Sequence, residues 1–337
     1  MITEFLNKLI NRQNLTLEET KNLALSMMSG EMTDLEIASI LIALQTKGIC
    51  ADELTGFAQI MREKALKISP KVDFCVDMCG TGGDGFSTFN ISTTVAFVVS
   101  ACGIKVAKHG NRAASSKSGS ADVLKSLGVR IELTPDQVCK SIEEIGIGFL
   151  FAPLYHLAMK YVMPIRKTLK TRTIFNLLGP LLNPAQVKYQ VIGVYDPNVL
   201  SIYAETMQNL GFENAMVVHG NGLDEISTTG PTQVFELENG RIMEYEIKPE
   251  DFGFKRAKVE DLKGGDPEEN AEILRNILAG KEKGAKLDIV LLNSAAVLKV
   301  CKKVSSWEKG IEMAREVLEN GEAEKKLENL IAFGNRE

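Results

Sequence analysis

Two glycine-rich segments carry most of the chemistry that this sequence could perform. Residues 80–85 read GTGGDG and residues 108–116 read KHGNRAASS, and each follows a short apolar run and precedes a helix-like stretch. Glycines let backbone amides approach a phosphate closely, and the amino end of a helix adds a partial positive charge. Lys108, His109 and Arg112 add cationic or polar donors to the second segment. The pattern predicts a site for a doubly phosphorylated ligand with more than one anionic group.

Other glycine-rich sites fit the sequence less well. Gly80, Gly82 and Gly85 satisfy the G-x-G-x-x-G pattern of dinucleotide-binding folds. Such folds place an Asp or Glu about 20 residues further on, where this chain has Lys105 and Lys108. The G-x-x-x-x-G-K-[ST] sequence of P-loop NTPases does not occur in the chain. Tight turns would explain either segment alone equally well, but two such segments in successive units favour a shared anion site.

Composition narrows the class of protein. The chain has 337 residues, of which 45% are hydrophobic and 25% charged, which is typical of a globular protein with room for about two domains. A net charge of −5 and a pI near 5.5 argue against a non-specific nucleic-acid binder. The six cysteines are scattered without a C-x-x-C pair, so we expect buried free thiols. Residues 1–10 indicate an amphipathic helix rather than a signal peptide, and no apolar stretch is long enough to span a bilayer, so we expect a cytoplasmic protein.

Helices should form the first 70 residues. Residues 16–19 (TLEE) and 33–36 (TDLE) each place a hydroxyl three residues before a glutamate, which predicts helix starts near residues 17 and 34. We expect Asp52 to cap a further helix that ends before residues 69–70.

From residue 72 the pattern changes to apolar runs that alternate with helix-like segments, which predicts a mainly parallel sheet covered on both faces. The expected strands are residues 72–78, 103–107, 187–195 and 214–219, with a helix over 199–210, a hairpin of 234–237 and 241–247, and closing helices over 268–279, 287–300 and 306–333. Residues 151–184 interrupt this alternation, and we expect two helical pieces there, broken by Pro164 and by Gly179-Pro180. These pieces should pack back on the N-terminal helices and leave a cleft, a common place for a ligand.

Four motifs give the chain a family likeness. They are GTGGDG followed by TFNIST (residues 88–93), KHGNRAASS followed by SGSAD (118–122), RTIFNLLGPLLNP (172–184) and HGNGLDEIS (219–227). In this order and from end to end, they resemble the anthranilate phosphoribosyltransferase family of tryptophan biosynthesis. The resemblance implies transfer of the 5-phosphoribosyl group from phosphoribosyl pyrophosphate (PRPP) to the amino group of anthranilate, with release of pyrophosphate. It also implies Mg²⁺, two ions per monomer, and a homodimer.

The fold that the resemblance implies is like that of the pyrimidine nucleoside phosphorylases. A small N-terminal helical domain would be hinged to a larger α/β domain with a mainly parallel central sheet. The expected helical domain comprises residues 1–71 plus about 160–185, and the expected α/β domain comprises residues 72–159 plus 186–337.

The resemblance also assigns site residues. Those matching the PRPP site are Gly80, Gly83, Asp84, Thr88, Asn90, Ile91, Ser92, Thr93, Lys108, His109, Gly110, Asn111, Arg112, Ala113, Ala114, Ser115, Ser116 and Ser120. Those matching the anthranilate site are Gly80, Asn111 and Arg166, with His156 as a further candidate. Those matching the metal ligands are Ser92, Asp224 and Glu225. An arginine fork suits a carboxylate, and an acidic pair suits a magnesium ion that also binds phosphates.

No obligatory general base is expected. The amine of anthranilate is already an uncharged nucleophile, so the site must supply alignment with the ribose and help for the leaving pyrophosphate.

The chain departs from the family pattern at two places. The usual His-Pro-Ala-Met reads HLAM at residues 156–159, and the usual Leu-Gly-x-Arg-Thr reads LKTRT at 169–173. Both lie near the expected anthranilate channel. Two alternatives stay open. One is a pyrimidine nucleoside phosphorylase-like enzyme, whose second segment usually lacks KHGNR. The other is a nucleic-acid-binding paralogue without transferase activity, which the acidic pI and the Asp224-Glu225 pair oppose.

Overall fold

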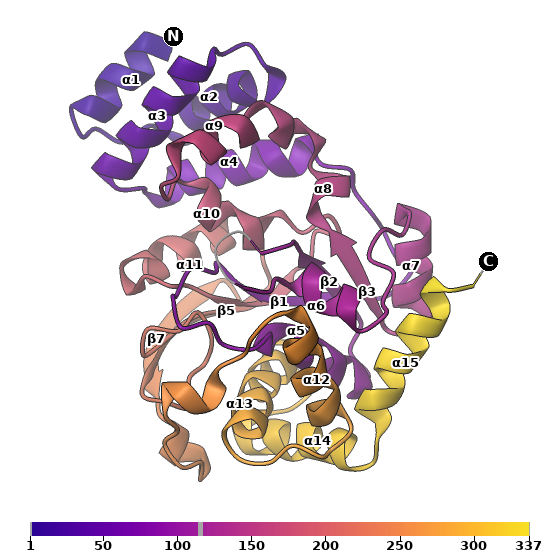
Figure 1. The fold of residues 1–337 in the computed structure, drawn as a ribbon. Helices are drawn as coiled ribbons and strands as arrows, with labels where there is room; N and C mark the ends of the chain where they lie inside the picture. Colours follow the sequence, from indigo (N-terminus) through magenta and orange to yellow (C-terminus); the bar gives the residue numbers. More distant parts are fainter. Residues whose placement is uncertain (1, 114–116, 337) are drawn as a thin grey trace.

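The computed structural model describes residues 2–113 and 117–336, so the candidate residues Ala114, Ser115 and Ser116 lie outside the described residues. The chain begins with four helices, which form the upper part of the molecule in Figure 1. They are α1 (Ile2–Ile10), α2 (Leu17–Ser29), α3 (Asp34–Lys47) and α4 (Ala51–Lys64).

The starts of these helices test the capping predictions. Thr16 and Thr33 are the N-caps of α2 and α3, and each forms the predicted capping box. The prediction for Asp52 is wrong, because the N-cap of α4 is Cys50 and Asp52 lies in the first helical turn. Glu53, three residues after the cap, accepts the Cys50 amide hydrogen at 3.0 Å and so performs the reciprocal half of the box.

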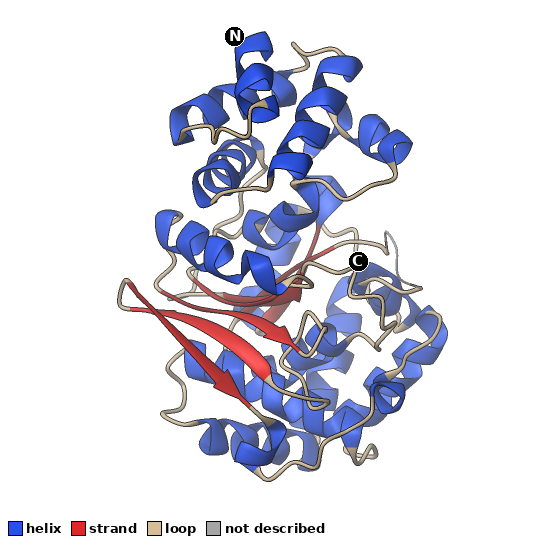
Figure 2. Ribbon diagram, turned by 90° about the vertical axis from the view of Figure 1, so that its left-hand side faces the viewer, coloured by secondary structure: helices blue, strands red, loops and turns tan. Residues whose placement is uncertain are grey.

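A seven-stranded sheet forms the centre of the lower part, with the strand order β3-β2-β1-β4-β5-β6-β7. The strands are β1 (Val76–Gly80), β2 (Val106–Gly110), β3 (Ile147–Phe151), β4 (Tyr189–Gly193), β5 (Asn214–Gly220), β6 (Thr232–Glu238) and β7 (Arg241–Ile247). The first five pair in parallel, and the predicted hairpin of β6 and β7 adds two antiparallel strands at one edge. Figure 2 shows this sheet lying between helices. The predicted fold class, a helical part beside a mainly parallel α/β part, is confirmed.

Alternate residues of the strands enter two different cores. Val106, Phe149 and Val191 face a core shared with α5 (Ile91–Ala101) and the C-terminal helices. Ala107 and Ile192 face a second core, which includes the N-terminal helices. The remaining helices are α6 (Ser120–Ser126), α7 (Pro135–Glu144), α11 (Leu200–Asn209), α12 (Pro267–Leu278), α13 (Ala285–Val300), α14 (Trp307–Glu319) and α15 (Glu322–Gly334). Short 3₁₀ turns are η3 (Pro197–Val199), η4 (Pro249–Phe252) and η5 (Val259–Leu262).

The segment between β3 and β4 returns to the N-terminal helices, as expected. It contains α8 (Ala152–Tyr155), η1 (Leu157–Tyr161), α9 (Met163–Leu169), α10 (Phe175–Leu178) and η2 (Gly179–Leu182). Helix α9 packs against α3, and α10 packs against α4 (Figure 1). Pro164 does not break a helix as predicted, because it lies in the first turn of α9, where its missing amide hydrogen has no partner to lose.

The strand bounds predicted from apolarity are partly wrong. Strands β1 and β2 begin at Val76 and Val106, three or four residues later than expected, because pairing between them starts at those two residues. Gly80 and the residues Lys108–Gly110 therefore belong to strands rather than to loops. Strand β3 was missed, since its five buried residues adjoin the segment interpreted as an interruption.

Candidate functional site

The order in which the chain adds strands to the sheet reverses between β1 and β4. The chain runs from β1 outward to β2 and β3, and then returns to place β4 on the other side of β1. In open parallel sheets, ligands bind in the crevice outside the carboxyl ends of the strands at such a switch point. The first glycine-rich segment begins there, because Gly80 ends β1 and lies opposite Gly193, which ends β4.

Both of these terminal glycines make room for Asp224. A Cβ on Gly80 would lie 1.9 Å from Asp224 Oδ2, and a Cβ on Gly193 would lie 1.7 Å from the Asp224 carbonyl oxygen. The amide of Gly82 donates a hydrogen bond of 2.7 Å to Asp224 Oδ2. The fold therefore brings the acidic pair, which is remote in sequence, directly onto the first glycine-rich segment.

Three carboxyl groups crowd this place. Burial, followed by the nearby charge of Asp84, raises the pKa of Asp224 to about 7. Burial and the charge of Asp224 raise the pKa of Glu225 well above its ordinary value, while Lys108 and the Ser92 amide oppose that shift. Within residues 2–113 and 117–336, no three His, Cys, Asp or Glu side chains form a metal centre by themselves. Carboxylates that repel one another beside a hydroxyl-bearing Ser92 fit a hard cation that completes its shell with phosphate oxygens and water.

The amino end of α5 faces the same segment of chain. Asn90 is the N-cap, but its side chain does not cap the helix. Instead, Asn90 Nδ2 donates to the Ser118 carbonyl at 3.2 Å and connects the amino end of α5 to the chain that follows the second glycine-rich segment. The side chains of Ile91 and Thr93 are buried, so these residues could reach a ligand only through their amides. Thr88 lies further out, where it forms an isolated bridge with Lys263.

Asp122 organises the second glycine-rich segment. Its Oδ2 accepts hydrogen bonds from the amides of Ala113 and Gly119 at 2.8 and 3.0 Å. Arg112 lies 3.8 Å from Asp122 Oδ1. At the end of β2, Gly110 allows Ser120 Oγ to approach to 2.1 Å of the position that a Cβ would take. The same hydroxyl donates to the carbonyl of Asn111 at 3.3 Å.

Lys108 is buried, whereas a lysine that extends into solvent to bind a phosphate would be exposed. Its Nζ donates to the Met78 carbonyl at 2.6 Å, and its charge stabilises the carboxylates of Asp77 and Glu225. Its ammonium group is therefore bonded to the backbone of β1. If Lys108 contributes to phosphate binding, it also stabilises the contact between β1 and β2.

Asp77 ties β1 to its neighbours. Its carboxylate accepts hydrogen bonds from the amides of Met78 and His109 at 2.8 and 3.3 Å and from Asn183 Nδ2 at 2.8 Å. Asn183 Nδ2 also donates to the Ala107 carbonyl at 2.7 Å. Burial raises the pKa of Asp77 to about 6, against the opposing effects of Lys108 and these donors.

His109 and His156 form a pair. Their Nε2 atoms are 3.1 Å apart, and the rings meet edge to face. Burial lowers the pKa of His156 to about 4 and that of His109 well below its ordinary value, the latter with help from the charges of His156 and Lys108. Burial thus favours the neutral form of both rings. They join β2 to the segment between β3 and β4, which is called the excursion below.

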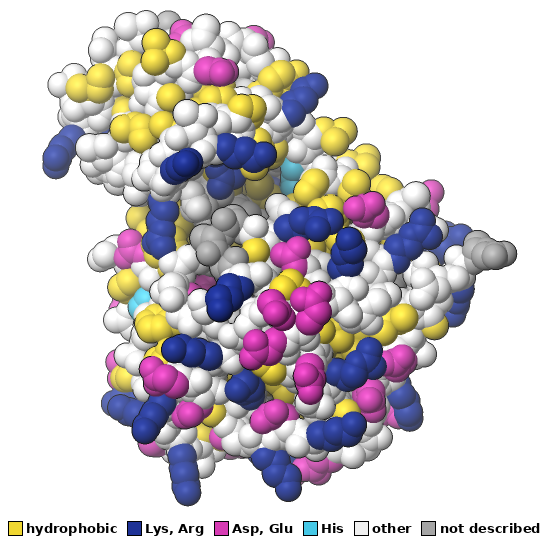
Figure 3. All heavy atoms as spheres, in the orientation of Figure 1, with side chains coloured by type: hydrophobic (Ala, Val, Ile, Leu, Met, Phe, Trp, Pro, Cys, Tyr) yellow, Lys and Arg dark blue, Asp and Glu magenta, His cyan; other side chains and the backbone are white. Residues whose placement is uncertain are grey.

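Two arginines of the excursion stack on aromatic rings. The Arg166 guanidinium lies 5.4 Å from the centroid of the Phe175 ring, and burial lowers its pKa. In the part of the chain that the structure describes, no hydrogen bond or ion pair joins Arg166 to Asn111, so the predicted anthranilate contacts are not connected directly. Arg172 lies 3.7 Å from the centroid of Tyr195 and donates a hydrogen bond to the Gly83 carbonyl. Figure 3 shows Lys and Arg side chains gathered where the helical part meets the sheet part.

Sequence reasoning missed four residues of this neighbourhood, which are Asp77, Arg172, Asn183 and Tyr195. Arg172 and Asn183 lie in the quoted RTIFNLLGPLLNP motif, and that was the only signal for them. Their partners are 89 and 106 residues distant, so no local spacing indicates the contacts.

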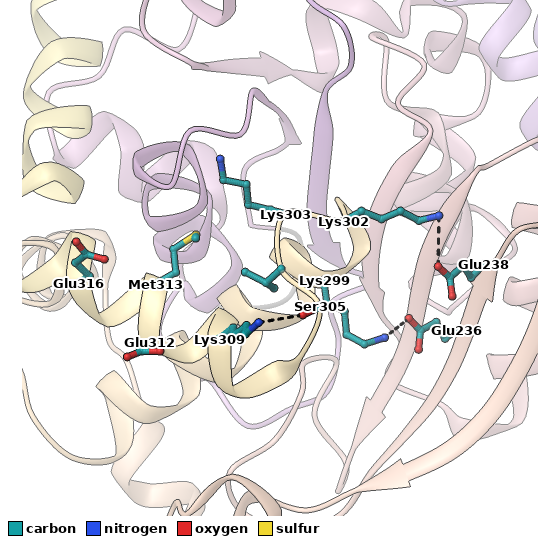
Figure 4. Close-up of a pocket in the computed structure, with 11 residues that line it drawn as sticks. Glu236, Glu238, Lys299, Lys302, Lys303, Ser305, Lys309, Glu312, Met313 and Glu316 are labelled. Carbon is teal, nitrogen blue, oxygen red and sulfur yellow. Dashed lines mark hydrogen bonds and ion pairs between the residues drawn. The ribbon is translucent and has the colours of Figure 1, made fainter.

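A separate hollow of about 860 Å³ lies between β6 and the junction of α13 and α14 (Figure 4). Its charged side chains largely neutralise each other, since Lys299 pairs with Glu236 at 2.5 Å and Lys302 with Glu238 at 3.4 Å. Glu238 lies opposite Asn214, the first residue of β5. This hollow is therefore at the amino ends of the parallel strands, away from the glycine-rich segments.

Comparisons with known proteins show the family of the chain. A model of the "Glycosyl transferase family, helical bundle domain" matches residues 3–65, and one of the "Glycosyl transferase family, a/b domain" matches residues 73–324. The chain is 52% identical over 336 residues to an anthranilate phosphoribosyltransferase of Acetivibrio thermocellus, covering 99% of this chain and 97% of the relative. It is likewise 52% identical over 337 residues to one of a Thermoanaerobacter species, covering 100% of this chain and 99% of the relative.

Solved structures of anthranilate phosphoribosyltransferases superimpose on nearly the whole chain. The crystal structure of the Thermus thermophilus anthranilate phosphoribosyltransferase superimposes with a TM-score of 0.93 at 44% identity, covering 98% of this chain and 99% of that one. The Saccharomyces cerevisiae enzyme in complex with PRPP and Mg superimposes with a TM-score of 0.91 at 29% identity, covering 99% and 97%.

Proposed function

The chain belongs to the anthranilate phosphoribosyltransferase family, and on that premise we propose how its residues bind and align the two substrates. The enzyme is a pentosyltransferase that moves the 5-phosphoribosyl group of PRPP onto the amino group of anthranilate and releases pyrophosphate, a step of tryptophan biosynthesis. Neither alternative, the nucleoside phosphorylase-like enzyme or the nucleic-acid-binding paralogue, is favoured by a specific observation.

PRPP is held at the switch point between β1 and β4. The meeting of Gly80, Gly82 and Asp224 there is the observation that carries this proposal. Backbone amides of residues 83–85, which follow the Thr81 and Gly82 amides already bonded to Gly193 and Asp224, would donate hydrogen bonds to phosphate oxygens, helped by the positive end of the α5 dipole. Residues 110–113 of the second segment would complete the site, and the bond from Asn90 Nδ2 to the Ser118 carbonyl connects the amino end of α5 to the chain beyond that segment. The solved yeast relative in complex with PRPP and Mg supports this assignment.

Mg²⁺ would be held by Asp224, Glu225 and Ser92, with two ions per monomer. Bound there, the metal would neutralise pyrophosphate oxygens and so stabilise the leaving group. The raised pKa values of both acids reflect burial and repulsion between carboxylates, and a cation relieves that repulsion.

The reaction needs alignment more than proton transfer. The lone pair of the anthranilate nitrogen forms a bond to C1 of the ribose as the bond from C1 to the pyrophosphate oxygen breaks. The bonding electrons leave with pyrophosphate, and the nitrogen then releases a proton to solvent. The neutral pair of His109 and His156 would orient the acceptor without competing for its charge. Arg166 would bind the anthranilate carboxylate with its planar fork.

We further propose a domain boundary near residue 71 and a cytoplasmic location. The two family matches end at residue 65 and begin at residue 73, which supports a boundary near residue 71. The six free cysteines support a reducing compartment such as the cytoplasm. In the described residues, no helix is both long and apolar enough to cross a membrane.

A homodimer would cover an exposed apolar face of the helical part. Ile10 of α1 and Leu35 and Ile42 of α3 are 64%, 77% and 40% exposed. Leu35 and Ile42 are seven residues apart and so share one face of α3. Packing of α1 against α3 brings Ile10 into the same part of the molecule. Such side chains are typical of surfaces that pair with a second copy.

A direct assay tests the proposed function. The protein is incubated with PRPP, Mg²⁺ and anthranilate, and the fluorescence of anthranilate is followed while pyrophosphate is measured in parallel. Loss of fluorescence that requires all three components, with one pyrophosphate released per anthranilate consumed, is the expected result. Activity that needs no PRPP would contradict the proposal.

A further inference from the structure

We propose that Arg172 is a positioning residue that holds residues 80–85 in the form that binds PRPP, with Tyr195 as its platform. This inference rests on the proposed role of residues 80–85 in PRPP binding. The name "Arg172 latch" is used below for the contacts of Arg172 with Gly83 and Tyr195.

The latch has a defined geometry. Arg172 Nη2 donates a hydrogen bond to the Gly83 carbonyl, and its guanidinium carbon lies 3.7 Å from the centroid of the Tyr195 ring. Among the ion pairs of residues 2–113 and 117–336, none involves Arg172. Its charge is thus satisfied by a carbonyl dipole and an aromatic face rather than by a carboxylate.

The latch spans the switch point of the sheet. Gly83 follows β1, and Tyr195 follows β4, the neighbouring strand. The Tyr195 amide donates to Thr81 Oγ1 at 3.2 Å, and the Thr81 amide donates to the Gly193 carbonyl at 2.9 Å. The platform on which Arg172 stacks is therefore itself fastened to the first glycine-rich segment.

Arg172 and Asp224 hold the segment from two sides. Asp224 accepts the amide hydrogen of Gly82, while Arg172 donates to the carbonyl of the next residue, Gly83. Gly82 and Gly83 both have positive φ, +70° and +82°, a backbone form that glycine adopts without strain but also leaves readily. Hydrogen bonds to the Gly82 amide and the Gly83 carbonyl order this backbone before PRPP binds, so less conformational entropy is lost on binding.

Arg172 connects residues 80–85 to the helical part of the molecule. Arg172 lies between α9 and α10, which pack against α3 and α4. The order of the PRPP segment thus depends on where the excursion lies. Lysine would not replace Arg172, because a lysine ammonium lacks the flat surface that stacks on a ring while an edge nitrogen donates.

Calorimetric titration of PRPP with Mg²⁺, in the absence of anthranilate, tests the latch. We expect Arg172→Ala and Arg172→Lys to raise the Kd for PRPP by about tenfold or more, the effect of losing a hydrogen bond from a charged group. Tyr195→Phe keeps the ring and should bind PRPP like the wild type, whereas Tyr195→Leu should weaken binding. Arg256→Ala is the matched control, since this exposed arginine pairs with Glu250 on the surface.

Steady-state kinetics distinguish a role in PRPP binding from a role in folding alone. Arg172→Ala should raise the KM for PRPP far more than the KM for anthranilate. An equal rise in both would overturn the proposal, as would a Kd for PRPP unchanged from the wild type. If Arg172→Ala fails to fold, the comparison of Tyr195→Phe with Tyr195→Leu decides, and equal PRPP affinity of those two variants overturns the latch. A wild-type protein that catalyses the reaction but binds no PRPP alone would overturn the latch and leave the family activity standing.

Discussion

At the scale of single side chains, the site combines crowded carboxyl groups with arginines that stack on rings. Asp84, Asp224 and Glu225 repel one another at the carboxyl end of the sheet. Arg166 and Arg172 lie on Phe175 and Tyr195 and, among the described residues, form no ion pair with a carboxylate. Carboxyl groups that repel one another suit a metal-bound diphosphate, and arginines without a carboxylate partner suit an anionic acceptor.

Replacement of Arg166 by alanine should affect one substrate only. Because Arg166 is assigned to the anthranilate carboxylate, the KM for anthranilate should rise by about tenfold to 100-fold, the effect of losing a charge-assisted hydrogen bond. The KM for PRPP should change little, and steady-state kinetics with each substrate varied in turn measure both. An equal rise in the two values would contradict the assignment, and a fall in kcat would mean that Arg166 also aligns the amine in the transition state.

Asp77 should make stability depend on pH. Its folded pKa of about 6 lies above the ordinary value of 3.8, so the folded state binds more protons than the unfolded state between these values. The contribution of Asp77 to stability is therefore complete below about pH 4 and is lost as pH rises to about 6, by up to about 3 kcal/mol. Asp77→Asn removes this titration, so its stability deficit should be larger at pH 5 than at pH 7.5.

Urea unfolding at the two pH values measures that difference. A buried apolar residue provides the control, because Ile40→Val removes no titratable group and its stability deficit should be the same at both pH values. A deficit for Asp77→Asn that is the same at both pH values would show that the buried carboxyl does not titrate in this range.

The sequence predicted the chemistry of the site better than it predicted the contacts of individual side chains. The acids at 224–225 and the glycines at 80–85 were identified as candidates, and the structure brings them together. Lys108 was expected to reach phosphate, yet it donates to the Met78 carbonyl inside the sheet. The direction of a side chain on a strand depends on pairing register, and register is a tertiary property.

At the scale of elements, the site depends on two strands that both end in glycine. Because a Cβ on Gly193 would lie 1.7 Å from the Asp224 carbonyl oxygen, Gly193→Ala should displace the loop that carries the acidic pair. Misplacement of catalytic groups by about 1 Å can cost about 100-fold in rate, and we expect a loss of that size in kcat/KM. The thermal midpoint should fall only modestly, since the strand itself remains paired.

Gly179→Ala is the matched control for that experiment. A Cβ there would meet no atom within 4 Å, so activity should stay within about twofold of the wild type. Full activity of Gly193→Ala would show that Asp224 does not need its present position.

Elements were predictable where a local signal specifies them. The capping boxes at Thr16 and Thr33 fixed two helix starts, because both partners of each box lie within three residues. Strand bounds were not predictable to that precision. Apolar character begins before the residues at which β1 and β2 become neighbours, and β3 has no turn signal to separate it from the excursion.

At the scale of the whole molecule, one core joins the helical part to the sheet. Leu41 and Phe57 of the N-terminal helices belong to the same cluster as Ala107 and Ile192 of the sheet. The excursion between β3 and β4 adds α9 and α10 to this junction. His156 and Arg166, which we propose to contact anthranilate, lie on that excursion, and the segments proposed to bind PRPP adjoin the sheet. The relative placement of the two parts would then set the distance between the substrates.

The proposed homodimer is testable at this scale. Leu35→Asp places a charge on the most exposed apolar side chain of α3, whereas Leu35 itself supports little of the monomer core. We expect the wild type to have twice the monomer mass by light scattering and Leu35→Asp to have the monomer mass with an unchanged circular dichroism spectrum. A wild type that is monomeric at micromolar concentration would contradict the proposal.

If the ends of β1 and β4 hold a metal-bound pyrophosphate through Asp224, replacing Asp224 should raise the magnesium concentration that the enzyme requires. The Mg²⁺ concentration for half-maximal rate is measured for the wild type and for Asp224→Asn, which keeps the size of the side chain and removes its charge. Asp224→Asn should require at least about tenfold more Mg²⁺ at saturating PRPP and anthranilate, in line with the loss of one charged ligand. An unchanged magnesium requirement at full activity would contradict the account.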